Sequence, residues 1–466
     1  MMVGMTGEQT RTTTPPPRRT PAAGEPPRTA PRAGGPGARL LVVGIVLAAL
    51  NLRPAITSLG ALLEEVRDGL GMSGSVAGLL TSVPPLCFAF FGVMAPRLAR
   101  RFGPGAVVCA GMAAITAGLL LRPYAGGTTG FLAASALALM GIAVSNVLMP
   151  VIVKRHFPDR VGTMTGLYSM ALALGTSAAA AITVPMTEAL GGSWQTGLAL
   201  WAGLAAAAVL PWLPLARDRG TAREATDPAR ERQARDPRAP ARVPQPSTEG
   251  RARVPQQPAG AHAGAPRPTA APLRITRSRT AWALAVFFGL QATAAYITMG
   301  WMPQIFRDAG VPASTAGLLL AVTMAMGVPL AFVIPRVATR LPHQGPIVLA
   351  LGGCGLVGYA GLYLAPAGGA WAWALLLGIA NCAFPLALTM VGMRARTGAG
   401  VAQLSAFAQS TGYLISIPGP LLVGVLYQHS GGWGLPLALM AALMVPQTVV
   451  GVLAGRDRTV EEEAAR

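Results

Sequence analysis

The sequence is poor in charge. Only 12% of its 466 residues are Asp, Glu, Lys or Arg, whereas 52% are hydrophobic and the mean hydropathy is +0.49. A water-soluble globular protein carries about 25% charged residues. The scarcity of charge excludes an ordinary soluble domain and indicates a membrane protein that crosses the bilayer several times.

Residues that build metal, redox and catalytic sites are also scarce. The four cysteines stand singly inside apolar stretches, without a CxxC spacing, and are typical of small buried hydrophobic residues. The four histidines are equally isolated. An intramembrane enzyme would need clustered His, Asp or Glu, or a Ser/Lys pair, within the spans. We therefore predict no metal, no cofactor and no enzymatic activity.

The positive charge is unevenly distributed. A net charge of +19 suits nucleic-acid binding until the charges are located. All but four of the Lys and Arg residues fall in alternate connections and in the two tails; the exceptions are Arg53, Arg67, Arg122 and Arg307. This is the positive-inside pattern. We expect a protein of the cytoplasmic membrane with both termini in the cytoplasm, the lipid bilayer as a partner and no nucleic-acid partner.

Twelve apolar stretches are long enough to cross a bilayer, which takes about 20 helical residues. They cover 40–62, 73–95, 104–122, 128–152, 162–186, 194–215, 280–302, 313–335, 345–365, 370–392, 399–422 and 433–455. The sequence thus predicts an all-α integral membrane protein with five segments. These are a disordered cytoplasmic tail (1–38), a six-helix bundle (39–215), a disordered cytoplasmic linker (216–278), a second six-helix bundle (279–455) and a cytoplasmic tail (456–466).

The two predicted bundles are related by an internal repeat. Ser75-x-Ala77-Gly78-Leu79-Leu80 recurs 239 residues later as Ser314-x-Ala316-Gly317-Leu318-Leu319. The same offset joins Pro96-Arg97-x-Ala99-x-Arg101 to Pro335-Arg336-x-Ala338-x-Arg340. An even number of spans per repeat gives both halves the same orientation. Two parallel six-helix repeats joined by a long linker describe the major facilitator architecture.

One charge lies deep in the first span. Arg53 is about 20 Å along a helix that starts near Leu40, just past the midplane of a core roughly 30 Å thick. A guanidinium there costs about 2.5–3.5 kcal/mol unless it faces a polar cavity or snorkels to the surface. Its equivalent in the second half is Ala292, so the charge belongs to one half only. We expect Arg53 to face a cavity and to bind an anionic or acceptor-rich solute.

Other polar residues gather in the spans expected to line that cavity. Asn51 shares the first span, but on a regular helix it points about 200° away from Arg53 unless Pro54 distorts the turn. Asn146 and Asn381 each precede a proline by four residues, as ligand contacts or as packing devices. The remaining candidates are solute contacts or polar glue between helices. They are Tyr168, Gln291, Tyr296, Trp301 and Gln409.

The connection after the second span resembles the facilitator loop signature of Gly, a basic pair and Gly. Its aspartate is missing, and Pro96 and Arg97 stand in its place. The predicted gating cations are Arg97, Arg100 and Arg101, with Arg336 and Arg340 in the second half. The alternative for these residues is simple positive-inside anchoring.

Residues 51–60, NLRPAITSLG, resemble the helix-1 signature of the cyanate permease and nitroimidazole transporter branch of the major facilitators. Weaker likeness extends through 95–103, 146–150, 157–160, 164–169, 287–291 and 301–303. The resemblance implies solute transport by alternating access, with cyanate import and nitroimidazole export as examples in that branch. These solutes are small and either anionic or rich in acceptors, in agreement with Arg53.

The sequence therefore predicts a secondary or facilitative transporter for a small anionic or acceptor-rich solute, with an unassigned coupling ion. A broad drug exporter of the same fold is the alternative, followed by a membrane sensor or scaffold. No Asp or Glu lies deep in a span, so proton coupling would have to use a carboxylate at a helix end or a proton carried by the solute.

Overall fold

The computed structural model describes residues 36–217 and 275–464, which form helices and turns without a strand. The tail expected over 1–38 and the linker expected over 216–278 lie almost entirely outside these residues. The described chain begins with a helix at Pro36, so the first bundle starts slightly earlier than predicted.

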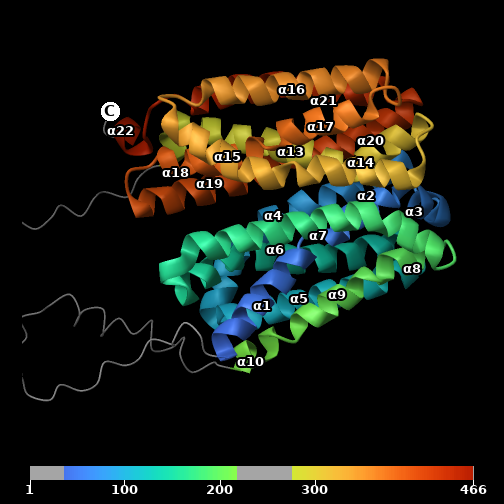
Figure 1. Cartoon of the computed structure of the whole chain (residues 1–466), viewed down its shortest axis with the longest axis horizontal. Coiled ribbons are helices and arrows are strands. Elements are labelled where there is room, and N and C mark those ends of the chain that lie inside the picture. Colours follow the sequence, from blue (N-terminus) through green and yellow to red (C-terminus); the bar gives the residue numbers. More distant parts are fainter. Residues whose placement is uncertain (1–35, 218–274, 465–466) are drawn as a thin grey trace, which may run out of the picture.

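The chain forms two helical bundles that lie side by side, with the first coloured blue to green and the second yellow to red (Figure 1). The first bundle contains α1 (Pro36–Asn51), α2 (Pro54–Ala61), α3 (Leu63–Leu70), α4 (Gly74–Phe102), α5 (Pro104–Leu121), η1 (Arg122–Tyr124), α6 (Thr128–His156), η2 (Pro158–Arg160), α7 (Val161–Ala189), α8 (Trp194–Ala199), α9 (Trp201–Val209) and α10 (Trp212–Arg217).

The second bundle contains η3 (Ile275–Arg277), α13 (Arg279–Asp308), α14 (Ala313–Ala325), α15 (Gly327–Arg340), α16 (Gly345–Leu364), α17 (Ala370–Asn381), α18 (Ala383–Met393), α19 (Gly398–Ser416), α20 (Pro418–Ser430), α21 (Gly434–Ala454) and α22 (Val460–Ala464). The start of α1, the end of α10 and the C-terminus share one end of the bundles (Figure 1). We call this end the terminal face and the other end the opposite face.

Eleven helical segments in the described part of the chain are long and apolar enough to cross a membrane. The sixth expected span is present as α8, α9 and α10, which follow one another along the bundle (Figure 1). It is interrupted at Leu200 and Leu210, whose backbone angles remain those of a right-handed helix. Pro211 lacks the N–H that a continuous helix would use there. Eleven of the twelve predicted spans are therefore found as helices able to cross a membrane, and the sixth is found as an apolar helical segment in three pieces.

Proline also explains breaks in the other interrupted spans. Pro385 cannot donate to the Asn381 carbonyl, and α17 ends at Asn381. Pro329 cannot donate to Ala325, and α14 ends there. The first span breaks between α1 and α2 at Pro54. These breaks free backbone carbonyls at membrane depth, where they need other partners.

The repeat motif found in the sequence packs the bundles together. Gly78 on α4 lies against α20, where an added Cβ would be 2.8 Å from the Leu421 carbonyl oxygen. Its equivalent, Gly317 on α14, lies against α7, where a Cβ would be 2.6 Å from the Ala180 carbonyl oxygen. Both distances are too short for a side chain, so glycine is required at each site. The two halves therefore meet through the same motif used twice.

The C-terminal segment is more than the tail predicted over 456–466. It forms α22, where Val460 is 1% exposed and its N–H donates to the Arg394 carbonyl at 2.9 Å. Glu463 accepts bonds from the Ser278 and Thr280 hydroxyls at 2.6 and 2.7 Å. The carboxylate of Glu461 accepts the Thr397 N–H at 3.2 Å. This helix fastens the starts of α13 and α19 together at the terminal face.

Candidate functional site

The principal cavity lies between the two bundles. It encloses about 430 Å³ and is lined by the turn at Arg53 and by α7 from one bundle, and by α13 to α15, α17 to α19 from the other. Its wall extends to Thr165, Pro335 and Thr389, which approach the ends of their helices at the terminal face. Most of the wall is apolar, as expected of a small-molecule site.

Arg53 lines this cavity and is half-buried. No carboxylate in the ranges 36–217 and 275–464 forms an ion pair with it, and no Asp or Glu is among the described residues that line the cavity. Tyr296 and Tyr413 line the same cavity. The cavity wall therefore carries a positive charge together with two tyrosine hydroxyl groups.

The local fold explains how Arg53 reaches the cavity. Helix α1 tightens at its end, where Leu52 N donates to Ala49 O at 3.2 Å. The Arg53 carbonyl then accepts the N–H groups of Ile56 and Thr57 at 2.9 and 3.1 Å, which starts α2. Arg53 itself has φ −128° and ψ −27°, outside the helical range. The residue thus sits on a turn between two helices.

Asn51 lies at the same break but does not line the cavity. It is 2% exposed, and its Nδ2 donates to the Leu47 carbonyl at 2.8 Å and to the Leu204 carbonyl at 3.2 Å. The amide therefore ties the end of α1 to α9. The distortion at Pro54 has not turned Asn51 and Arg53 toward the same space.

Gln291 and Asn381 line the cavity as a bonded pair. Gln291 Nε2 donates to Asn381 Oδ1 at 3.2 Å and to the Asn381 carbonyl at 3.4 Å, the carbonyl that Pro385 leaves free. Gln291 Oε1 is buried without a hydrogen-bond partner among the described groups. At Asn381 the freed carbonyl is thus bonded by Gln291 and not by its own amide, while its role as a ligand contact stays a prediction.

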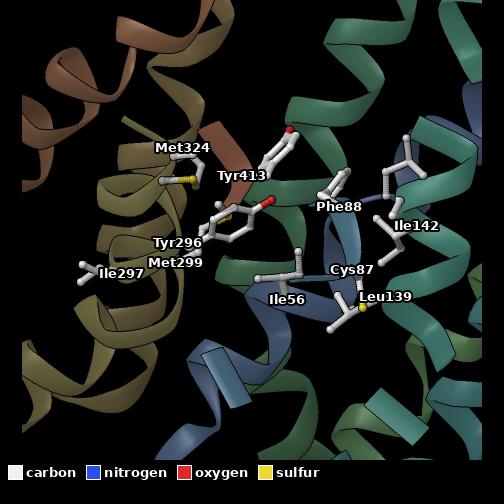
Figure 2. Close-up of a cluster of buried hydrophobic side chains, with 14 of the residues drawn as sticks. Ile56, Cys87, Phe88, Leu139, Ile142, Tyr296, Ile297, Met299, Met324 and Tyr413 are labelled. Carbon is white, nitrogen blue, oxygen red and sulfur yellow. The ribbon is translucent and has the colours of Figure 1, made fainter. Parts of the chain in front are cut away.

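Aromatic rings form part of the cavity wall, which includes Phe288, Tyr296 and Tyr413, and Phe88 packs against the two tyrosines without lining the cavity. Tyr413 stacks on Phe88 with ring centres 5.0 Å apart and meets Phe288 edge-on at 5.2 Å. Tyr296 lies 6.5 Å from Phe88. Figure 2 shows Tyr296, Tyr413 and Phe88 grouped between ribbons of the two bundles. Phe88 and Phe288 were not among the predicted site residues, because a Phe in an apolar span carries no signal that separates cavity from core.

The other predicted contacts lie in different surroundings. The Tyr168 hydroxyl donates to Asn146 Oδ1 at 2.5 Å within the first bundle, and neither residue lines the cavity. Trp301 is fully buried, and its Nε1 donates to Thr81 Oγ1 of the other bundle at 3.2 Å. Gln409 bonds Ser405 on its own helix at 2.7 Å and does not line the cavity.

The five predicted gating cations are all exposed near the terminal face, on the ends of α4 and α15. Arg336 donates to the Phe332 carbonyl at 3.0 Å, and Arg101 lies over the Phe102 ring at 5.1 Å. None of Arg97, Arg100, Arg101, Arg336 and Arg340 forms an ion pair with another residue that the structure describes. Within the described residues, no hydrogen bond or ion pair links the arginines at the end of α4 with the segment that carries Arg336 and Arg340.

The opposite face is closed by contacts between the bundles. Arg307, at the end of α13, pairs with Glu64 at 2.8 Å and Glu65 at 2.9 Å, both on α3. Ser75 N–H and Oγ donate to Gln428 Oε1 at 2.9 and 2.8 Å. Together with the glycine contacts, these bonds seal one end of the interface, while the cavity extends toward the terminal face.

A second group of contacts at the opposite face centres on Asp308. Its carboxylate accepts the Tyr427 hydroxyl and the Trp433 N–H, each at 2.8 Å, and the Gln304 amide at 2.7 Å. Arg67 of the first bundle lies over the Tyr427 ring at 5.6 Å. Arg67 and Asp308, from different bundles, thus both contact Tyr427.

Comparison with known proteins agrees with this arrangement. The model of the Major Facilitator Superfamily matches residues 41–416. The uncharacterized transporter YycB of Bacillus subtilis (strain 168) is 32% identical over 429 residues, which cover 90% of this chain and 94% of that protein. The 2-nitroimidazole transporter of Escherichia coli (strain K12) is 31% identical, covering 90% and 96%.

The cyanate transport protein CynX of Escherichia coli (strain K12) is 28% identical, over 87% of this chain and 94% of its own. Among solved structures, the nucleoside transporter NupG superposes with a TM-score of 0.65 at 13% identity and covers 90% of this chain and 99% of its own. The family match spans both bundles, and the relatives are transporters rather than enzymes. This chain belongs to the Major Facilitator Superfamily.

Proposed function

We propose that the protein is a secondary or facilitative transporter for a small anionic or acceptor-rich solute, of the size and chemistry of cyanate or a nitroimidazole. The observation that carries the proposal is Arg53, a cation that no described carboxylate neutralises, lining the cavity between the bundles. Uncompensated charge at membrane depth is costly, and an anionic or strongly accepting ligand offsets that cost.

The surroundings of Arg53 fit such a solute. Tyr296 and Tyr413 line the same cavity as Arg53, and the Gln291–Asn381 pair adds amide groups from the second bundle. Aromatic rings beside them can pack against a planar solute. The proposed solute contacts are therefore Arg53, Gln291, Tyr296, Asn381 and Tyr413.

The solute crosses by alternating access. The described conformation is sealed at the opposite face and open toward the terminal face, which the distribution of Arg assigns to the cytoplasm. It is thus the inward-facing state of a protein of the cytoplasmic membrane. The exposed cations on α4 and α15 lie where the bundles would meet when this end closes, which keeps their gating role as part of the proposal.

A broad drug exporter is the second candidate, favoured by the apolar and methionine-containing wall that includes Met299, Met324 and Phe384. The test is a panel of ligands measured by thermal shift on the purified protein. We expect cyanate, 2-nitroimidazole or a similarly small acceptor-rich compound to raise the melting temperature. Stabilisation by lipophilic cations such as tetraphenylphosphonium, and by none of the small anions or azoles, would instead support the exporter.

A further inference from the structure

A second buried arginine lies in the first bundle. Arg122 belongs to η1 at the opposite face, and its side chain points into the bundle and is 2% exposed. No carboxylate of residues 36–217 or 275–464 lies within ion-pair distance of it. A fully buried cation without a counter-ion calls for an explanation.

The guanidinium of Arg122 donates hydrogen bonds to a single helix. Nη1 donates to the Ala55 carbonyl at 2.9 Å, and Nη2 donates to Ser58 Oγ at 3.4 Å. Both acceptors are on α2, the short helix that begins directly after Arg53. The planar guanidinium spans two acceptors that lie three residues apart on that helix, which a lysine ammonium cannot do with the same geometry.

Helix α2 needs such an attachment. Pro54 removes the hydrogen bond to the Leu50 carbonyl, so α2 is joined to α1 by a turn and not by a continuous helix. The Arg53 carbonyl is bonded to the N–H groups of Ile56 and Thr57. The backbone of Arg53 therefore turns with the first turn of α2, and whatever fixes α2 also fixes the direction of the Arg53 side chain.

The repeat supports a role beyond scaffolding. At the 239-residue offset, Arg53 corresponds to Ala292 and Arg122 to Gly361, so neither cation has a counterpart in the second bundle. Packing contacts such as those of Gly78 and Gly317 do recur. Arg53 and Arg122 are thus both confined to one half, and both act on the same interrupted span.

We propose that Arg122 is a positioning residue, which fixes α2 through its bonds to Ala55 and Ser58 so that the guanidinium of Arg53 points into the cavity. The inference rests on the proposed function, because it assigns Arg53 the role of solute anchor. Arg122 itself does not line the cavity and makes no contact with the solute.

The test measures the field of Arg53 without using a solute. In a variant lacking Cys87, Cys109, Cys354 and Cys382, Ala295→Cys places a single thiol in the cavity wall. The purified protein is reacted with two methanethiosulfonates, one bearing a sulfonate and one a trimethylammonium group. The ratio of the two rates reports the positive charge near the thiol, and Arg53→Gln defines the ratio when that charge is absent.

We expect Arg53→Gln to lower the anion-to-cation rate ratio by about tenfold. Arg122→Lys, which keeps the charge but loses the fork, should lower it by at least about threefold. Ser58→Ala should also lower the rate ratio. Ser82→Ala, which removes a buried hydroxyl without a described partner, should leave the ratio unchanged.

A folded Arg122→Lys protein with the parent rate ratio would overturn the proposal. Arg122→Gln, which removes the charge as well, is the comparison. A lower ratio in Arg122→Gln but not in Arg122→Lys would also overturn the proposal, since it would assign the effect to the charge of Arg122 and not to its geometry. If Arg122→Lys does not fold, Ser58→Ala takes its place, and a rate ratio equal to that of the parent would overturn the proposal. Failure of the proposed function has a different signature: the rate ratio would still depend on Arg53, but Arg53→Gln would bind the solute as the parent does.

Discussion

Gly60 and Met299 touch across the interface between the bundles, because a Cβ on Gly60 would overlap the Met299 carbonyl oxygen. The two residues are 239 positions apart, so each is the repeat equivalent of the other. Their contact therefore lies on the axis that relates the two halves. It belongs to the sealed side of the interface, near the Trp301–Thr81 bond.

Enlarging Gly60 should open this seal. Gly60→Ala places a methyl group against the Met299 backbone, and overpacking of this kind costs about 1–3 kcal/mol. We expect the described state, sealed at the opposite face, to lose population and the transport rate to fall about tenfold or more. Spin-label distances between positions 124 and 363, at the opposite face, should lengthen. Gly203→Ala, on an open surface of α9, is the matched control and should behave as the parent does.

Removing Arg307 should loosen the same face by a different route. Its ion pairs with Glu64 and Glu65 are partly exposed, with 18% of the arginine side chain accessible, so together they contribute about 1 kcal/mol. Arg307→Ala should shift the balance between the two states about fivefold toward the one open at the opposite face, as read by the same spin labels. Arg279→Ala, at the other end of α13, should have no effect. Unchanged distances in Arg307→Ala would remove these pairs from the gate.

Lysine should replace Arg53 only in part. Arg53→Lys keeps the charge but loses the planar fork that can bond two acceptors at once. We expect the KM for uptake of the solute found in the ligand panel to rise about tenfold, with a smaller change in the maximal rate. An equal KM for both proteins would mean that the solute requires only a point charge at this position.

The C-terminal helix should detach in acid. Burial raises the pKa of Glu461, but hydrogen bonds from the Arg396 and Thr397 N–H groups outweigh it and leave the pKa below its ordinary value of 4.5. Burial likewise raises the pKa of Glu463, and bonds from Ser278 and Thr280 lower it overall. A lowered pKa in the folded state gives stability that is present above 4.5 and lost as the pH falls through the lowered value.

A spin label on exposed position 458 should therefore be immobile at neutral pH and become mobile below about pH 4.5. Glu461→Gln and Glu463→Gln should increase its mobility already at neutral pH, whereas Glu462→Gln, whose carboxylate pairs with the exposed Arg396, should do so less. A label that stays immobile in acid and in both Gln variants would show that Val460 packing alone holds α22.

The sequence was sufficient for the class, the spans and the repeat, because long apolar runs and a fixed offset are properties of the chain itself. It also identified Arg53, since a charge at membrane depth is conspicuous without coordinates. The segmentation of the sixth span was not predicted, because Pro211 and Pro214 lie in a run that remains apolar throughout.

The direction in which a side chain points from its helix was harder to predict than its depth in the membrane. Asn51, Trp301 and Gln409 lie at suitable depths, but the structure turns them toward helix packing, the sealed face and Ser405. Arg122 shows the same difficulty, since its position in a turn gave no sign that its long side chain reaches back to α2. The attachment of α22 depends on Ser278, 185 residues away, which no local pattern can reveal.

The most direct test of the central claim is calorimetric titration of the purified protein and of Arg53→Gln with the solute selected by the ligand panel. The account predicts that the parent protein binds and that the variant, folded and equally stable, binds at least about tenfold more weakly, since bonds to a charged group contribute about 1.5–3 kcal/mol. Equal affinity in the two proteins would contradict the assignment of Arg53 as the solute anchor.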